Sequence, residues 1–439
     1  MLENLSDVQI GFIGIGVLVT LIALRVPIGV SLIGVSFFGI WAIVGQKAAW
    51  GILGVVPYSF AATWQLSSVP MFLLMGFFCF HAGLTKGLFD AARVWLAGLP
   101  GGLAVAAVFG AAGFAAVTGS SVACAAAMGR IAVPEMMRYR YDVSLATGTV
   151  AAAGTIGALI PPSILMILYG IIAEVPISQL FLGGVGAGLL TAFGYVVVIT
   201  VRASLNPELA PKLTEKVPLS EKVAALADTW PVILLMAGVF GGLFAGLFTP
   251  TEAGAVGAFL SVVIAAIKRS LTWQNFKNAL LETLLTSAAL FIIAIGASML
   301  TRFLAFSGAG DYLSDLVVAI GAHELLLLVG ISLVYLVLGM FLEPIGAMLL
   351  TLPILLPIID STGFSLIWFG VLLTKFLEIG MITPPIGLNV FVIKGVVGDL
   401  ATTSLIFKGI LWFLVSDLIV IVLMMAFPEI VLYLPSLVE

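Results

Sequence analysis

Long apolar segments are the feature that most constrains this chain. Residues 178–201 hold no charged side chain, and residues 403–426 hold only two. A helix needs about 20 mostly apolar residues to cross a bilayer, and a spanning segment must satisfy its own backbone hydrogen bonds, as a helix does. Because 62% of the 439 residues are hydrophobic and 9% are charged, the sequence predicts an all-α polytopic membrane protein in a lipid bilayer.

The sequence lacks the parts of several kinds of enzyme. It contains no CxxC, HExxH or GxxxxGK[ST] motif and only two histidines, which disfavours zinc chemistry and ATP hydrolysis by this chain. Its two cysteines, Cys79 and Cys124, fall in apolar segments, which indicates packing rather than a disulfide. We therefore expect no enzyme, no organic cofactor and no nucleic-acid partner, and an energy source that is an ion gradient or another subunit.

Ten apolar runs are expected to cross the membrane. The first is too long for a cleaved signal peptide and is expected to remain as a helix. The runs lie near residues 8–25, 28–45, 69–84, 142–174, 178–201, 229–247, 251–267, 285–301, 364–394 and 403–426.

Two further runs, 100–134 and 322–358, are interrupted midway by polar or helix-breaking residues. The interruptions are VTGSSVACA at 117–125, here called the first tip, and MFLEPIGAM at 340–348, the second tip. We expect two re-entrant helical hairpins whose tips stop inside the bilayer. Such an arrangement is tolerated only where the tip is buried in protein or lines a cavity.

A shift of 223 residues aligns the helix-breaking residues of the two halves. The aligned pairs are Pro27 with Pro250, Gly34 with Gly257, Trp50 with Trp273, Gly87 with Gly310, Pro134 with Pro357, Gly157 with Gly380, and Pro161-Pro162 with Pro384-Pro385. The sequence thus predicts a duplicated unit. The expected domains are a first repeat (1–202, with hairpin 100–134 and broken helix 142–174), a linker (203–228) and a second repeat (229–439, with hairpin 322–358 and broken helix 364–394).

Charge indicates how the two repeats are oriented. Each repeat contains five crossings, and an odd number makes the second repeat point the opposite way. With the N-terminus outside, fifteen of the 18 basic residues fall on the inner side, in agreement with the positive-inside rule. We therefore expect two inverted-topology repeats, both termini in the periplasm and linker 203–228 in the cytoplasm.

Segment 270–284 has an amphipathic pattern. Trp273, Phe276, Leu280 and Leu284 share one helical face, which predicts an interfacial helix lying in the membrane plane. Residues 50–64 are its counterpart at the 223-residue shift. The alternative is that both segments are ordinary surface loops.

The two Pro-Pro pairs predict broken helices. Proline removes a backbone donor and clashes with the preceding turn, so "GTIGALIPPS" and "EIGMITPPIG" should each form two half-helices around an unwound stretch. Freed carbonyl oxygens suit a cation such as Na⁺, and half-helix N-termini suit an anionic substrate. The alternative is a proline kink that neighbouring side chains satisfy.

The tips offer two kinds of chemistry. Thr118, Gly119, Ser120 and Ser121 are small or hydroxylated, able to bind a cation or a carboxylate, although small residues also serve close helix packing. In the second tip, Glu343 is either a functional acid near the site or the water-exposed end of a shallow tip.

Ionisable residues inside spans are costly and are candidates for function. Lys375 and Glu378 are three residues apart and can neighbour each other on a helix. They are either a substrate-contacting pair or a structural pair that fastens helices. Asn389, after the second Pro-Pro pair, could bind substrate or close a helix start.

Four motifs together carry a family resemblance. They are "TGSSVACAAAMG", "GTIGALIPPSILMILYG", "GMFLEPIGAMLLTLPILLPI" and "EIGMITPPIGLNVFVIKG". In this order, they resemble the large membrane (permease) subunit of tripartite ATP-independent periplasmic (TRAP) transporters, the dicarboxylate-type family. The resemblance implies an elevator-type secondary transporter of the ion transporter superfamily, in the bacterial inner membrane. It would import an organic acid (a C4-dicarboxylate, sialic acid or a similar carboxylate), coupled to Na⁺.

The resemblance also implies partners and site residues. The partners are a small four-helix membrane subunit, expected as a separate polypeptide, and a periplasmic substrate-binding protein. A first Na⁺ site would fall on Gly119, Ser120, Gly154, Thr155 and Gly157 and a second on Gly346, Gly380, Thr383 and Pro384, mostly through backbone carbonyls, while substrate would lie near Ser120, Ser121, Pro344 and Gly346.

Other functions remain open from the residues alone. A stand-alone divalent-anion symporter or ion antiporter could share the same inverted-repeat plan. An intramembrane enzyme is disfavoured, because no nucleophile, base and metal set accompanies the ionisable residues.

Overall fold

The computed structural model describes residues 5–211, 217–319 and 324–438, and all regular elements there are helices. The helices before the linker are α1 (Asp7–Ala23), α2 (Ile28–Ile43), α3 (Gln46–Ala61), α4 (Ser68–His81), α5 (Lys86–Leu96), α6 (Gly102–Thr118), α7 (Ser121–Arg138), α8 (Val143–Gly154), α9 (Ile164–Ile172) and α10 (Ile177–Leu205). Short 3-10 turns at η1 (Trp64–Ser67) and η2 (Thr155–Ala158) lead into α4 and follow α8.

The later helices are α11 (Leu219–Ala227), α12 (Trp230–Phe244), α13 (Pro250–Ile267), α14 (Trp273–Ser307), α15 (Ala309–Ala319), α16 (Glu324–Phe341), α17 (Pro344–Thr362), α18 (Leu366–Gly380), α19 (Leu388–Val397), α20 (Thr403–Ala426) and α21 (Glu429–Leu432). Two 3-10 turns, η3 (Gly398–Leu400) and η4 (Pro435–Leu437), complete the described chain.

Six helical segments are long and apolar enough to cross a membrane. A seventh is counted if α11 and α12, which bend by 47° at their junction, form one span. The six are Trp64–His81, Ile177–Leu205, Pro250–Ile267, Trp273–Ser307, Pro344–Thr362 and Thr403–Ala426. The predicted all-helical, multi-span architecture is therefore confirmed.

Helix ends follow the 223-residue register that the sequence indicates. Helices α5 and α15 both begin and end at matching positions, since 86 + 223 = 309 and 96 + 223 = 319. Helix α7 begins at Ser121 and α17 at Pro344, which is again 223 residues later. The matched starts do not share one cap, because the Ser120 hydroxyl caps α7 and the Glu343 carboxylate caps α17.

Both expected hairpins and both broken spans contain the predicted interruptions. Helices α6 and α7 pack against each other and are joined by Gly119-Ser120, while α16 and α17 are joined by Leu342-Glu343. Residues 159–163, the first break, separate η2 from α9, and residues 381–387, the second break, separate α18 from α19. Positions 322 and 323, where the second hairpin was expected to start, lie outside the described residues.

One sequence-based expectation needs correction, and the linker contains helical segments. The interfacial helix 270–284 and the span 285–301 are one continuous helix, α14, because neither proline nor glycine occurs between Trp273 and Gly296 to separate them. The linker 203–228 is also partly helical: α10 continues to Leu205, and α11 packs against α5.

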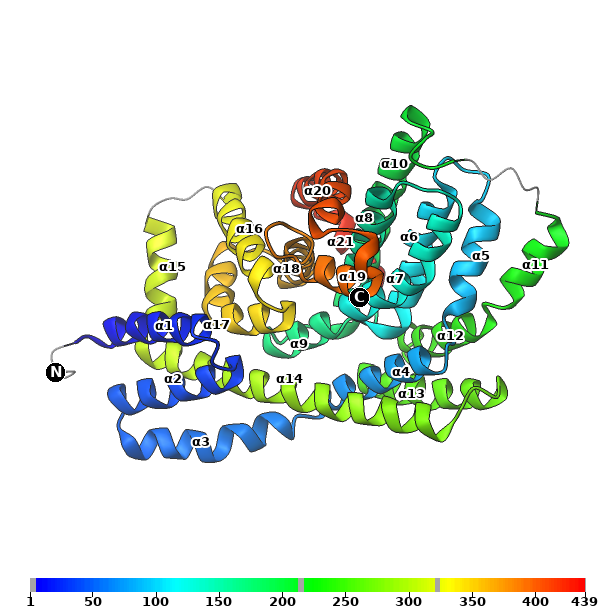
Figure 1. Ribbon diagram of the computed structural model, residues 1–439. Helices are drawn as coiled ribbons and strands as arrows, with labels where there is room; N and C mark the ends of the chain where they lie inside the picture. Colours follow the sequence, from blue (N-terminus) through cyan, green and yellow to red (C-terminus); the bar gives the residue numbers. More distant parts are fainter. Residues whose placement is uncertain (1–4, 212–216, 320–323, 439) are drawn as a thin grey trace.

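Two groups of helices flank the centre of the molecule (Figure 1). Helices α3, α4, α13 and α14 run lengthwise along one side, where α14 packs on α2 and α4 and α13 packs on α4. On the other side, α8 packs on α7 and α20, and α10 packs on α20. Both tips, the residues flanking the first break and the start of the second break line a cavity where these two groups meet.

Candidate functional site

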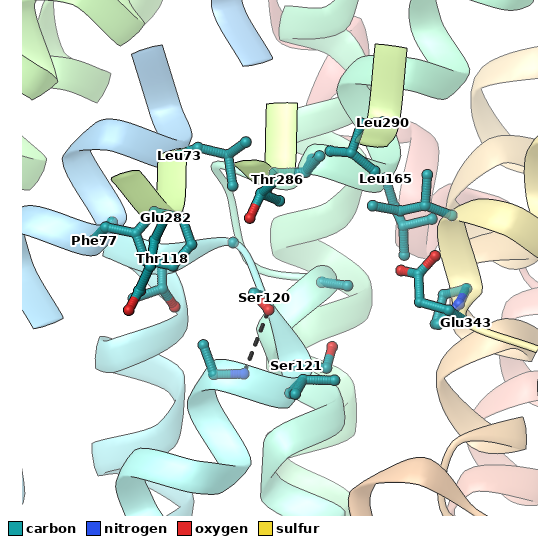
Figure 2. Close-up of a pocket in the computed structure, with 18 of the residues that line it drawn as sticks. Leu73, Phe77, Thr118, Ser120, Ser121, Leu165, Glu282, Thr286, Leu290 and Glu343 are labelled. Atoms are coloured by element: carbon teal, nitrogen blue, oxygen red, sulfur yellow. Dashed lines mark hydrogen bonds between the residues drawn. The ribbon is translucent and has the colours of Figure 1, made fainter. Parts of the chain in front are cut away.

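A cavity of about 540 Å³ lies between the two groups of helices. Its walls come from α4, from the middle of α14, from both tips, from residues beside the first break, and from the end of α18. In Figure 2, Ser120 and Ser121 lie near the centre of the cavity, with Phe77, Thr118 and Glu282 on one side and Glu343 on the other. Elements far apart in the sequence therefore converge on one space of the size that binds small molecules.

The first tip is held tightly against the first break. Gly119 has φ +61°, and a Cβ added there would lie 2.3 Å from the carbonyl oxygen of Pro162. A Cβ on Gly157 would lie 2.9 Å from the Cα of Ser121. The hydroxyl of Ser120 accepts a hydrogen bond from the backbone N–H of Ala123 at 3.4 Å and caps α7. Glycine is required here both for the left-handed turn and for the close backbone approach.

The remaining residues of the expected first cation site lie beside the break. Gly154 packs near Ala125 and the side-chain nitrogen of Asn389. The hydroxyl of Thr155 donates to the carbonyl of Ala152 at 2.7 Å and lies 3.0 Å from the hydroxyl of Tyr195. The Thr155 side chain is thus already engaged, which leaves backbone oxygens as the groups free to bind a cation.

Asn389 hydrogen-bonds both to the second break and to α8, the helix that precedes the first break. Its side-chain N–H donates to the carbonyl of Ala151 on α8 at 3.3 Å, and its backbone N–H donates to the carbonyl of Met381 at 3.0 Å. Its side-chain oxygen is buried and has no hydrogen-bond partner among the described residues. The residue therefore closes the start of α19 and ties it to the first half of the chain.

The second tip is built around Glu343. Its carboxylate caps α17 by accepting from the backbone N–H of Gly346 at 3.0 Å, and it also lines the cavity beside Pro344. Gly346 is not among the described residues that line the cavity. It instead lies against α2, where an added Cβ would come within 2.7 Å of Ile28. Of the four expected substrate residues, Ser120, Ser121 and Pro344 meet in the cavity.

Near the second break, as near the first, a glycine packs closely against the backbone of another element. A Cβ on Gly380 would lie 2.6 Å from the Cα of Gly339 on α16. The hydroxyl of Thr383 donates to the carbonyl of Ile379 at 2.7 Å. Pro384 follows in the unwound stretch, and the Pro384-Pro385 peptide bond, like Pro161-Pro162, is cis.

A buried polar network corrects the expected pairing of Lys375 with Glu378. The ammonium of Lys375 donates to the carboxylate of Asp417 on α20 at 2.6 Å. The hydroxyl of Tyr195 on α10 donates to the same carboxylate at 2.9 Å and contacts Thr155. All four side chains have 0% exposure. The network therefore connects α18, the helix before the second break, to η2, the turn before the first break.

Sequence reasoning missed Asp417 and Tyr195. Asp417 is the only acid in the apolar run 403–426, and an isolated intramembrane charge demands a partner of opposite sign. That signal could have linked it to Lys375. For Tyr195, a tyrosine in an apolar helix, the sequence carries no comparable signal.

A cation site here would rely on carbonyl and hydroxyl oxygens. Within the described residues, no group of three or more His, Cys, Asp or Glu side chains is placed to hold a metal ion. Both breaks and both tips contain non-helical backbone next to small or hydroxylated residues, and oxygen ligands are those that hard cations prefer.

The family comparison decides what kind of protein this is. The family described as "Tripartite ATP-independent periplasmic transporter, DctM component" matches residues 15–430. The chain belongs to this DctM family. It is therefore a multi-pass permease component of a bacterial TRAP transporter and not an enzyme.

Individual relatives of this DctM-family chain are also TRAP transporter permease proteins. It is 35% identical over 375 residues to the C4-dicarboxylate TRAP transporter large permease protein DctM of Pseudomonas aeruginosa, covering 85% of this chain and 86% of that protein. It is 31% identical to the sialic acid TRAP transporter large permease protein SiaM of Vibrio cholerae, covering 85% of this chain and 86% of that protein. The isethionate TRAP transporter permease protein DctMQ of Oleidesulfovibrio alaskensis is 30% identical, and the match covers 82% of this chain and 60% of that protein.

Solved structures support the fold of the DctM-family chain. It resembles Neisseria gonorrhoeae MtrF with a TM-score of 0.61 at 16% identity, covering 96% of this chain and 95% of that one. It resembles Alcanivorax borkumensis YdaH with a TM-score of 0.61 at 14% identity, covering 87% and 89%.

Proposed function

We propose that this chain is the membrane permease subunit of a Na⁺-coupled, binding-protein-dependent transporter that imports an organic acid. The observation that carries the proposal is the convergence of both tips and the ends of both broken helices on one cavity. Discontinuous helices place backbone carbonyls and half-helix N-termini around a substrate, as secondary transporters require. The C4-dicarboxylate and sialic acid relatives support a carboxylate substrate.

The proposed cation sites follow the two breaks. The first uses Gly119, Ser120, Gly154, Thr155 and Gly157, where Gly119 approaches the Pro162 carbonyl and Gly157 approaches the backbone of Ser121. The second uses Gly346, Gly380, Thr383 and Pro384 around the second break. Na⁺ there would offset the negative charge of a carboxylate substrate.

The proposed partners are a small membrane subunit and a periplasmic substrate-binding protein. The DctMQ relative supports the first, because this chain covers only 60% of its length and the remainder leaves room for a fused second component. We further propose that both termini face the periplasm and that the linker lies in the cytoplasm of the inner membrane, with the two repeats inverted.

The partner proposal predicts a sharp result in proteoliposomes. The chain reconstituted with its small subunit and binding protein should take up radiolabelled malate, succinate or sialic acid when a Na⁺ gradient is imposed, because the gradient supplies the energy. The same vesicles with K⁺ in place of Na⁺, or without the binding protein, should show background uptake. Efficient uptake by the lone chain would instead identify a stand-alone symporter.

We also propose an elevator mechanism, in which the tips and broken helices move against α4, α13 and α14. A Cβ on Gly76 of α4 would lie 3.0 Å from the Cα of Thr118 in the first tip, so cysteines at these two positions are within reach of a disulfide.

The elevator mechanism predicts that this disulfide arrests transport. In a background with Cys79 and Cys124 changed to alanine, oxidation of the Gly76→Cys, Thr118→Cys double variant should stop uptake, and reduction should restore it. Each single variant serves as the control and should not respond to oxidation. Equal uptake by the oxidised and reduced double variant would rule out motion between these elements.

A further inference from the structure

Glu378 is a buried acid without a full set of partners. It lies on α18 just before the second break, has 1% exposure, and lines the cavity. Its Oε2 atom has no hydrogen-bond partner among the described residues. An unpaired buried carboxylate oxygen is costly, because it has lost its hydration without gaining a partner. Such a group calls for a ligand or another explanation.

Among the described groups around Glu378, only the Ser121 hydroxyl remains available to donate to its carboxylate. Lys375, one turn earlier on α18, is bound to Asp417 on α20, which also receives the Tyr195 hydroxyl from α10. From the second tip, the Glu343 carboxylate is an acceptor and is occupied by a backbone N–H. From α7, Ser121 brings a buried hydroxyl next to this carboxylate. Among the described residues, neither Ser121 Oγ nor Glu378 Oε2 has a hydrogen-bond partner, so both remain open to a ligand.

The rest of the cavity is also rich in acceptors. Glu282, Glu343 and Glu378 line it, and no lysine, arginine or histidine is among the described residues of its wall. A substrate whose only polar groups are carboxylates would place acceptor against acceptor at Glu378. A substrate with a hydroxyl or ammonium group beside its carboxylate would supply the missing donor.

We propose that Glu378 and Ser121 form a subsite that binds a hydrogen-bond donor, a hydroxyl or a protonated amine, on the transported organic acid. This inference rests on the proposed function and narrows its substrate class to hydroxy- or amino-carboxylates. Glu378 accepts the donor's hydrogen, and Ser121 adds a second contact from the first tip. The subsite is thus formed jointly by an element of each half of the chain.

Binding of matched acids to the purified full-length chain tests the subsite. The probes are malate, aspartate and succinate, which share a four-carbon dicarboxylate and differ by a hydroxyl, an amine or neither. Dissociation constants come from ligand-dependent thermal stability in Na⁺ buffer. We expect malate or aspartate to bind about tenfold more tightly than succinate, the ratio for one well-formed charged hydrogen bond. Tighter binding of malate would identify the donor as a hydroxyl, and tighter binding of aspartate would identify it as an amine.

Variants assign the preference to the subsite. Glu378→Met keeps the side-chain volume and removes the acceptor, so the ratio of the dissociation constant of succinate to that of the favoured acid should fall to about onefold to twofold. Ser121→Ala should lower the same ratio in part. Glu221→Met, on exposed α11, should keep the wild-type ratio. If Glu378→Met does not fold, Glu378→Gln, which removes the charge and replaces one acceptor oxygen with an NH2 donor, should lower the preference for whichever of malate and aspartate the wild type favours.

Two outcomes separate the subsite from the broader function. Equal binding of all three acids by the wild type, or an unchanged ratio in Glu378→Met, overturns the subsite and leaves carboxylate transport standing. Absence of binding of every acid by the wild type, together with absence of uptake by the complete transporter, overturns both.

Discussion

Changing Asp417 to alanine should destabilise the protein by about 3–5 kcal/mol, the usual cost of leaving one member of a buried ion pair without its partner. The Lys375 ammonium has 0% exposure and donates to Asp417 at 2.6 Å, so the change strands a charge at bilayer depth. The Tyr195 hydroxyl loses its acceptor as well. The measurement is the thermal unfolding midpoint of the purified chain in detergent.

Two further variants show whether charge is the cause. In the double variant Lys375→Met, Asp417→Leu, both charges are removed together, and most of the lost stability should return, because a packed apolar pair often replaces a buried ion pair at little cost. Arg93→Ala breaks the partly exposed Arg93–Glu135 pair and should cost only about 0.2–1 kcal/mol. An Asp417→Ala protein as stable as the wild type would show that the network does not hold the helices together.

Changing Gly119 to alanine should lower uptake by tenfold or more while the chain remains folded. Residue 119 has φ +61°, and its new Cβ would lie 2.3 Å from the Pro162 carbonyl oxygen. The tip would therefore have to move away from the first break, and a strained backbone of this kind costs about 1–3 kcal/mol. Initial rates of Na⁺-driven uptake, measured over a range of Na⁺ concentrations, give the effect.

A matched control separates the clash from the backbone conformation. Gly363 has φ +74°, but nothing lies within 4 Å of a Cβ added there. Gly363→Ala should therefore carry the conformational cost alone and retain most of the uptake. If Gly119→Ala transported as well as Gly363→Ala, contact of the tip with the first break would not be needed for transport.

Helix breaks were predictable because their causes are local. Pro161-Pro162 and Pro384-Pro385 cannot continue a helix wherever they occur, and the glycine and hydroxyl residues of the first tip end one helix and cap the next. The 223-residue register could be recognised for the same reason, since it aligns residues that break helices. The continuity of α14 was not predicted, because an amphipathic pattern followed by an apolar one does not show whether a turn separates them.

Partners of buried charges were much harder to predict. Spacing along one helix makes Glu378 the obvious neighbour of Lys375, yet α20 packs beside α18 and brings Asp417 closer. Likewise, α10 places the Tyr195 hydroxyl 3.0 Å from the hydroxyl of Thr155, a contact that the sequence did not indicate. In both cases a side chain's partner depends on which helix packs next to it, and distant segments contribute that helix.

The sequence by itself determined that the chain is a helical membrane protein with two interrupted hairpins and two broken spans, because apolar length, proline and glycine act over a few residues. Only the tertiary structure decided that both tips, the residues flanking the first break and the end of α18 share one cavity, that Gly346 lies against α2 while Ser120, Ser121 and Pro344 line the cavity, and that Glu378 Oε2 has no hydrogen-bond partner among the described residues. Those facts arise from contacts between segments hundreds of residues apart, which local patterns do not specify.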